Sequence, residues 1–138
     1  MPILNYTTKV NAHQTLGEIQ GILARHGAKR IIHDYNDEGN ITGISFLIET
    51  PSGVRGIRLP ANVEGVRRAL EKQRQKADIA HAERVALRIV KDWLEAQMAI
   101  LEAQMVQMDE IFLPYMLNND GQQTLYEAYR DNQLMIGG

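Results

Sequence analysis

Cysteine is absent from this chain of 138 residues, which excludes disulfides, thiolate metal ligands and cysteine nucleophiles. Aromatic residues make up only 6% of the sequence, so few side chains could stack on the bases of a long nucleic-acid track. No apolar run approaches about 18 residues, and the N-terminus lacks the basic-then-apolar layout of a signal peptide. We therefore expect a protein of the cytoplasm that contacts no membrane.

The common catalytic signatures are also missing. The sequence contains no HExxH, no GxSxG and no GxxxxGK[ST] motif. Asp78 and His81 could share a metal ion, but Asp78 is better explained as a helix cap. Asp92, Glu95 and Glu102 could form an acid–base set, yet nothing in the sequence places a partner opposite them. We expect no enzymatic activity, no cofactor and no metal site.

Charge is distributed unevenly along a chain whose net charge is −2. Residues 55–91 hold ten basic and four acidic residues, which gives 10 − 4 = +6. Residues 92–138 hold one basic and eight acidic residues, which gives 1 − 8 = −7, and residues 1–54 give 4 − 5 = −1. The middle segment can therefore attract anions although the whole chain is nearly neutral.

The basic segment is the best functional lead in the sequence. Arg84, Arg88 and Lys91 are spaced i, i+4, i+7, so they share one helix face. Arginine forks there could bind the phosphates of a nucleotide-type ligand. The alternatives are a single-stranded nucleic acid, an assembly surface for the acidic segment of another copy, or a solvated face. The predicted ligand-binding residues are Arg84, Arg88, Lys91, Arg55, Arg58, Arg67 and Lys72.

Hydrophobic periodicity predicts one α+β domain, with a β-rich part over 1–60 and a helical part over 61–138. The first part would be a small antiparallel sheet with one packed helix, and one long helix would dominate the second. Strands are expected at 3–7, 29–36, 41–50 and 54–60. Helices are expected at 15–26 with a Thr15–Glu18 capping box, at 63–75 after an Asn62 cap, and at 79–113. A short last helix is expected after a Thr124–Glu127 capping box.

The helix expected at 79–113 carries the pentapeptide LEAQM twice, seven residues apart. Apolar residues there follow a 4-3-4-3-4 spacing that is typical of a coiled-coil seam. At 1.5 Å per residue this helix would be about 50 Å long, which exceeds the diameter of a compact domain of this size. We therefore predict a homodimer or higher oligomer. The predicted interface residues are Leu94, Met98, Leu101, Met105, Met108 and Phe112.

Several segments resemble a group of short proteins encoded by bacteriophages and prophages. They are NYTTK (5–9), GEIQGIL with HGA (17–28), and RIVKDWLEAQMAILEAQM with FLPYM (88–116). The resemblance implies an accessory protein made in the host cytoplasm, but it carries over no site residue. Such proteins disarm host defence, by sequestering nucleotide signals or inhibiting a host protein, or assist viral DNA metabolism. The predicted function is counter-defence binding, and the alternative is single-strand binding in replication or recombination.

Overall fold

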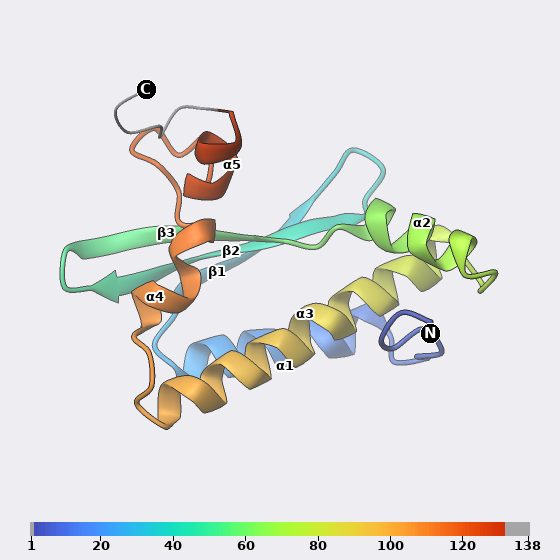
Figure 1. Cartoon of the computed structure of the whole chain (residues 1–138), viewed down its shortest axis with the longest axis horizontal. Coiled ribbons are helices and arrows are strands. Elements are labelled where there is room, and N and C mark those ends of the chain that lie inside the picture. The colour runs from blue at the N-terminus through green and yellow to red at the C-terminus, as the bar shows by residue number, and fades with distance from the viewer. Residues whose placement is uncertain (1, 132–138) are drawn as a thin grey trace.

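A three-stranded antiparallel sheet with two helices against one of its faces forms the body of the molecule (Figure 1). The computed structural model describes residues 2–131. Its elements are α1 (Ala12–Arg25), β1 (Lys29–Tyr35), β2 (Ile41–Thr50), β3 (Gly53–Pro60), α2 (Val63–Lys72), α3 (Ile79–Glu102), α4 (Met108–Phe112), the 3₁₀ turn η1 (Leu113–Tyr115) and α5 (Leu125–Arg130). The α+β fold with one long helix that the sequence predicts is confirmed.

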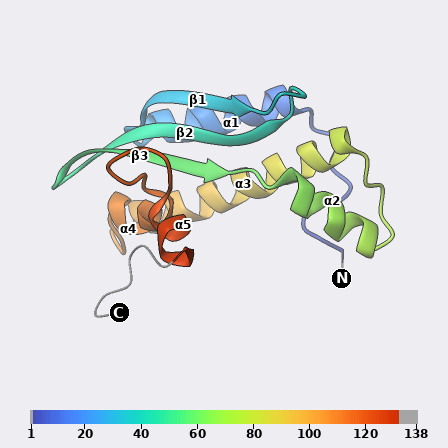
Figure 2. The same ribbon diagram turned by 90° about the horizontal axis from the view of Figure 1, so that it is seen from above.

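The sheet has the order β1-β2-β3, and α1 and α3 lie beneath it (Figure 2). Alternate residues of β2 point into the core, so Ile44, Phe46 and Ile48 are buried, as their spacing predicts. Gly43 lies opposite Pro60, where an added Cβ would come within 2.6 Å of the Leu59 carbonyl oxygen. Only glycine allows β2 and β3 to approach so closely at this end of the sheet.

The N-terminal segment differs from the prediction in two ways. Residues 3–7 form a turn rather than a strand, because Asn5 takes a φ of 65° and the backbone N–H of Tyr6 donates back to Ile3. Helix α1 begins at Ala12, because the side chain of Asn11 accepts from the N–H of Gln14. The predicted Thr15–Glu18 capping box is therefore wrong. Thr15 is buried inside the helix instead.

The long helix ends at Glu102, so the prediction that it continues to residue 113 is wrong. Gln104 takes a φ of 60°, and its N–H donates to Leu101 while that of Met105 donates to Ile100. These two bonds form a Schellman stop, which usually requires glycine. At 24 residues the helix is about 36 Å long, so its length no longer requires a second copy to cover it.

The break after α3 returns the chain to its own core. Phe112 is fully buried, with its ring 5.3 Å from that of Phe46 and 6.1 Å from that of Trp93, both edge to face. The ring of Tyr115 lies a further 5.8 Å from Trp93. Four aromatic rings thus run in a chain from the sheet to the surface, and each restricts the motion of the next.

The six residues of the predicted seam do not form one continuous stripe. Leu94, Met98 and Phe112 are buried in the chain's own core, whereas Met105 lies beyond the end of α3 and is 73% exposed. Leu101 and Met108 pack at the margin of the core. Most of this seam therefore stabilises the single chain, and association between copies stays a prediction that needs another surface.

Candidate ligand cleft

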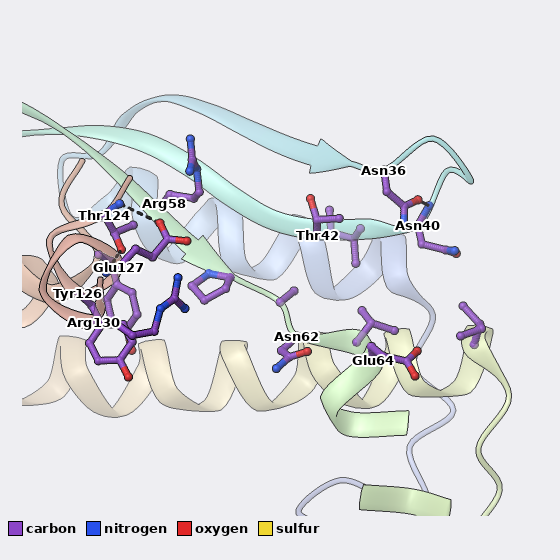
Figure 3. A pocket seen from close by; sticks show the side chains of 16 residues that line it. Asn36, Asn40, Thr42, Arg58, Asn62, Glu64, Thr124, Tyr126, Glu127 and Arg130 are labelled. Carbon is purple, nitrogen blue, oxygen red and sulfur yellow. Dashed lines mark hydrogen bonds between the residues drawn. The ribbon is translucent and has the colours of Figure 1, made fainter. Parts of the chain in front are cut away.

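A cleft of about 600 Å³ opens where the end of the sheet meets α2 and the C-terminal segment (Figure 3). One wall comes from the β1–β2 turn, the start of β2 and the start of α2, and the opposite wall comes from η1 and α5. Pro60, the last residue of β3, lies between the two walls. The lining residues are Asn36, Asn40, Ile41, Thr42, Arg58, Pro60, Ala61, Asn62, Val63, Glu64, Ile79, Tyr115, Thr124, Tyr126, Glu127 and Arg130.

The C-terminal segment reaches the cleft by pairing with the outer edge of β3. Met116 lies opposite Ile57, and the N–H of Leu117 donates to the Gly56 carbonyl at 2.8 Å. Helix α5 then starts at a capping box in which Thr124 and Glu127 bond each other's backbone N–H, as the sequence predicts. This edge pairing places α5, and with it Arg130, beside the end of the sheet.

Two arginines supply the positive charge of the cleft. The two terminal nitrogens of Arg58 donate to the carbonyls of Gly121 and Gln122, each at 3.3 Å. Within residues 2–131, no carboxylate lies within ion-pair distance of Arg58. Arg130 donates from Nε to the neighbouring Asp131 at 3.3 Å, an exposed pair of the kind that contributes little. In Figure 3 its guanidinium points into the cleft.

Several acceptor groups of the cleft are already occupied by the chain itself, although among the described residues nothing donates to the side-chain oxygens of Asn40 and Thr42. The Asn62 side-chain oxygen caps α2 by accepting from Gly65, and the Asn36 oxygen accepts from the N–H groups of Glu38 and Asn40. Both oxygens of Glu64 accept from Arg67, and this hydrogen-bonded guanidinium holds the pKa of Glu64 below its ordinary value. One oxygen of Glu127 accepts from the N–H of Thr124.

The donor groups of the cleft are mostly unoccupied. Among the described residues, nothing accepts from the side-chain NH₂ groups of Asn36 and Asn62 or from the terminal nitrogens of Arg130. The formal charges of the lining cancel, since two arginines face two glutamates. What distinguishes the site is therefore the imbalance between free donors and free acceptors, which favours an anionic ligand.

A smaller hollow adjoins the cleft. It holds about 180 Å³ and is lined by Leu59, Pro60, Ile89, Val90, Trp93 and Tyr115. Pro60 and Tyr115 line both spaces, so the two are adjacent. An apolar recess on α3 thus lies beside the polar cleft.

The structure does not bring the seven predicted ligand-binding residues to one surface, and only Arg58 lines the cleft. Arg88 forms an ion pair with Glu18 of α1, and Lys91 lies 2.6 Å from Glu95. A terminal nitrogen of Arg84 lies 3.4 Å from Nδ1 of His81, while its buried Nε has no partner among the described residues. The shared face of these three residues therefore serves mainly contacts within the chain.

The remaining predicted residues lie elsewhere. Arg55 bonds the carbonyls of Ser52 and Val54 at the β2–β3 turn, and Lys72 is exposed in the last turn of α2. Arg67 is held by Glu64 at 2.5 Å and by Glu71 at 2.6 Å. Their role in ligand binding stays a prediction, with weaker geometric support than that of Arg58.

The acidic residues considered for catalysis also have contacts within the chain. Asp92 accepts from the side-chain nitrogen of Asn5 at 2.8 Å, Glu95 pairs with Lys91, and Glu102 pairs with His26 at 3.0 Å. Asp78 caps α3 as expected. Within residues 2–131, no group of three or more histidine, aspartate or glutamate side chains could hold a metal ion.

Sequence reasoning missed most of the cleft. Arg130 is the single basic residue of the acidic segment, and that isolation was a usable signal. Asn36 and Asn40 looked like ordinary turn residues, because only the fold brings their turn next to α2. Tyr126 is 55% exposed and follows a recognisable helix cap, but its position opposite α2 depends on the edge pairing at β3.

Comparisons with protein-family models, with curated proteins and with solved structures find no match for this chain. In the part of the chain that the structure describes, no helix has the length and apolar character that crossing a membrane requires. The functional argument therefore rests on the geometry of the cleft.

Proposed function

We propose that this chain is a binding protein without enzymatic activity that holds a small, phosphate-bearing anion in the cleft. The observation that carries the proposal is the surplus of free donors. Arg130, Asn36 and Asn62 offer free N–H groups, and Arg58 adds a positive charge that only backbone carbonyls of the described residues contact, while the side-chain oxygens of Asn36, Asn62 and Glu64 are bonded within the chain. A phosphate accepts several hydrogen bonds and carries the charge that two guanidinium groups require.

The dimensions of the cleft support a small molecule. A volume of about 600 Å³ lies in the range of pockets that enclose small ligands, about 300–1,000 Å³. The walls come from ordered strand, helix and capped-turn residues, so the site is largely formed before binding. Pre-organisation reduces the entropy lost on binding.

The biological setting of the proposal comes from the resemblance to phage-encoded proteins. A protein without catalytic groups that binds a phosphate-bearing signal in the host cytoplasm would act by sequestration, which fits counter-defence. Inhibition of a host protein is the other form of that proposal. We also propose that the protein is a homo-oligomer. Its interface would lie outside the predicted seam, because most of that seam packs within the single chain.

Single-strand nucleic-acid binding draws less support from the geometry. A protein that binds the phosphate backbone of a single strand along a groove needs a row of unpaired basic side chains. Arg67, Arg88 and Lys91 are each paired with a carboxylate, so they neutralise acids within the chain. A short groove with two arginines fits one or two phosphates better than a strand.

The test is calorimetric titration of the whole protein with inorganic phosphate, adenosine monophosphate and a short single-stranded oligonucleotide. The proposal expects the mononucleotide to bind with modest salt dependence and the oligonucleotide to bind no better per site. Tight oligonucleotide binding that falls steeply with salt would favour the alternative and overturn the small-ligand proposal. Absence of binding by all three would overturn it as well. Native mass spectrometry of the purified protein gives the subunit number independently.

A further inference from the structure

The apolar hollow beside the cleft needs an explanation because several other apolar residues of the same helix are buried in the core. Val85, Leu94 and Met98 of α3 are buried in the core, and Arg88 of the same helix contacts α1. Ile89, Val90 and Trp93 line the hollow instead, and among the described elements only β3 and η1 border it. An apolar recess beside a polar cleft suits a molecule with one apolar and one polar end.

We propose that this hollow is the subsite for a planar heterocyclic ring, so that the ligand of the cleft is a nucleotide. The inference rests on the proposed function, since the phosphate would lie near Arg58 and Arg130 while the ring enters between Pro60 and Trp93. Pro60 and Tyr115 line both spaces, so one small molecule that passes these two residues would reach from one space into the other.

The aromatic chain below the hollow suits this role. Trp93 lies edge to face with the buried Phe112 at 6.1 Å and with Tyr115 at 5.8 Å, so its ring is restrained before any ligand arrives. A restrained indole stacks on a base at little entropic cost, and such stacking stabilises bound bases strongly.

The size of the hollow favours a ring over a partner protein. A helix with its side chains is about 10–12 Å across, too wide to enter a recess of about 180 Å³. A second copy could insert one side chain at most. A nucleotide fills the recess with its base and also uses the donors of the adjoining cleft, which a protein side chain does not.

Because Trp93 is the single tryptophan of the chain, its emission reports directly on the hollow. The experiment titrates the whole protein with adenosine monophosphate, adenosine and ribose phosphate, and follows tryptophan fluorescence and calorimetric heat. We expect the mononucleotide to change the emission and to bind about tenfold or more tightly than either fragment. We expect ribose phosphate to bind without changing the emission.

Paired substitutions on α3 locate the ring. Ile89→Ala removes apolar contact inside the hollow, whereas Ile100→Ala makes the same change outside it on the same helix. We expect Ile89→Ala to weaken mononucleotide binding by about fivefold or more and to leave ribose phosphate binding unchanged. Ile100→Ala should change neither. Circular dichroism before titration confirms that both variants keep the fold.

The outcomes separate the two proposals. If the mononucleotide and ribose phosphate bind equally well, or if both isoleucine variants behave alike, the ring subsite is wrong and the anion cleft stands. If no phosphate-bearing probe binds, the proposed function itself fails. If sedimentation shows a dimer that Ile89→Ala dissociates, the hollow is an interface between copies and the ring subsite is wrong.

Discussion

The basic residues of α3 and those of the cleft carry the same charge but face different groups. Arg88 and Lys91 have side chains only 16% and 14% exposed, and each lies against a carboxylate of the chain. Among residues 2–131, Arg58 donates only to backbone carbonyls, and Arg130 pairs only with its exposed neighbour. A charge paired with a carboxylate is neutralised within the fold, as Arg88 is by Glu18 of α1 and Lys91 by Glu95 of its own helix, whereas a charge without such a partner can hold a ligand. The partners of a basic residue therefore indicate its role better than its position in a basic segment.

Substitutions of core residues should lower the free energy of unfolding more than substitutions of either group of basic residues. Phe112→Ala removes the ring that Phe46 and Trp93 both contact, so we expect a loss of about 3–5 kcal/mol in the free energy of unfolding. Leu113→Ala, at the next position and 51% exposed, should change it by less than about 0.5 kcal/mol. Urea unfolding measures both. Similar losses in the two variants would contradict the assignment of Phe112 to the core.

The ion pair between α1 and α3 should have an intermediate effect. Glu18→Gln leaves Arg88, which is 16% exposed, without its carboxylate. Breaking a fully buried pair costs about 3–5 kcal/mol, and the partial exposure of Glu18 reduces our expectation to about 1–2 kcal/mol. Glu38→Gln, in the exposed β1–β2 turn, is the control and should have almost no effect on urea unfolding. If the two variants are equally stable, the pair with Glu18 does not stabilise the fold. Arg88 is then again a candidate ligand-binding residue.

The cleft arginines should show the reverse pattern, with an effect on binding and little effect on stability. Arg58→Gln removes a charge held only by carbonyls, so the free energy of unfolding should change by less than about 0.5 kcal/mol. The dissociation constant for adenosine monophosphate should rise about tenfold, since one charged hydrogen-bond donor is lost. A large loss of stability with unchanged binding would place Arg58 with the structural arginines.

The smallest effect concerns Glu64, where the cleft and α2 meet. Its pKa lies below the ordinary value of 4.5 because Arg67 donates to the carboxylate. The resulting stability is present above the ordinary pKa and is lost as the pH falls through the lower pKa of the folded protein. Because the pair is exposed, we expect wild type to exceed Glu64→Gln only slightly in melting temperature at neutral pH, and the two to converge below about pH 4.5. A difference that does not vary with pH would contradict the ion pair.

The sequence predicted the elements of the fold better than the positions where they begin and end. The strands at 29–36 and 41–50 and the caps at Asn62, Asp78 and Thr124 could be predicted because alternation and capping are local properties. The end of α3 could not be predicted, because Gln104 adopts the left-handed backbone conformation that glycine usually takes at the end of a helix. The return of Phe112 to the core accompanies that break, and it is a property of the whole fold.

The candidate site was harder to predict for the same reason. The basic segment contributed Arg58, and the i, i+4 spacing of Lys91 and Glu95 allows their pair, but the pairing of Arg88 with Glu18 could not be read from their positions. Arg130 reaches the cleft only because Met116 and Leu117 extend the edge of β3. Contacts between residues far apart in the sequence decide which charges remain available.

The central claim is that Arg58 and Arg130 bind the anion, and one titration tests it most directly. Adenosine monophosphate is titrated by calorimetry into wild type, into the double variant Arg58→Gln with Arg130→Gln, and into Arg25→Gln with Arg68→Gln. The second pair removes the same charge from exposed positions outside the cleft. We predict a loss of affinity of about a hundredfold in the cleft variant and of less than about threefold in the control. Equal losses in the two variants, or none in the cleft variant, would contradict the account.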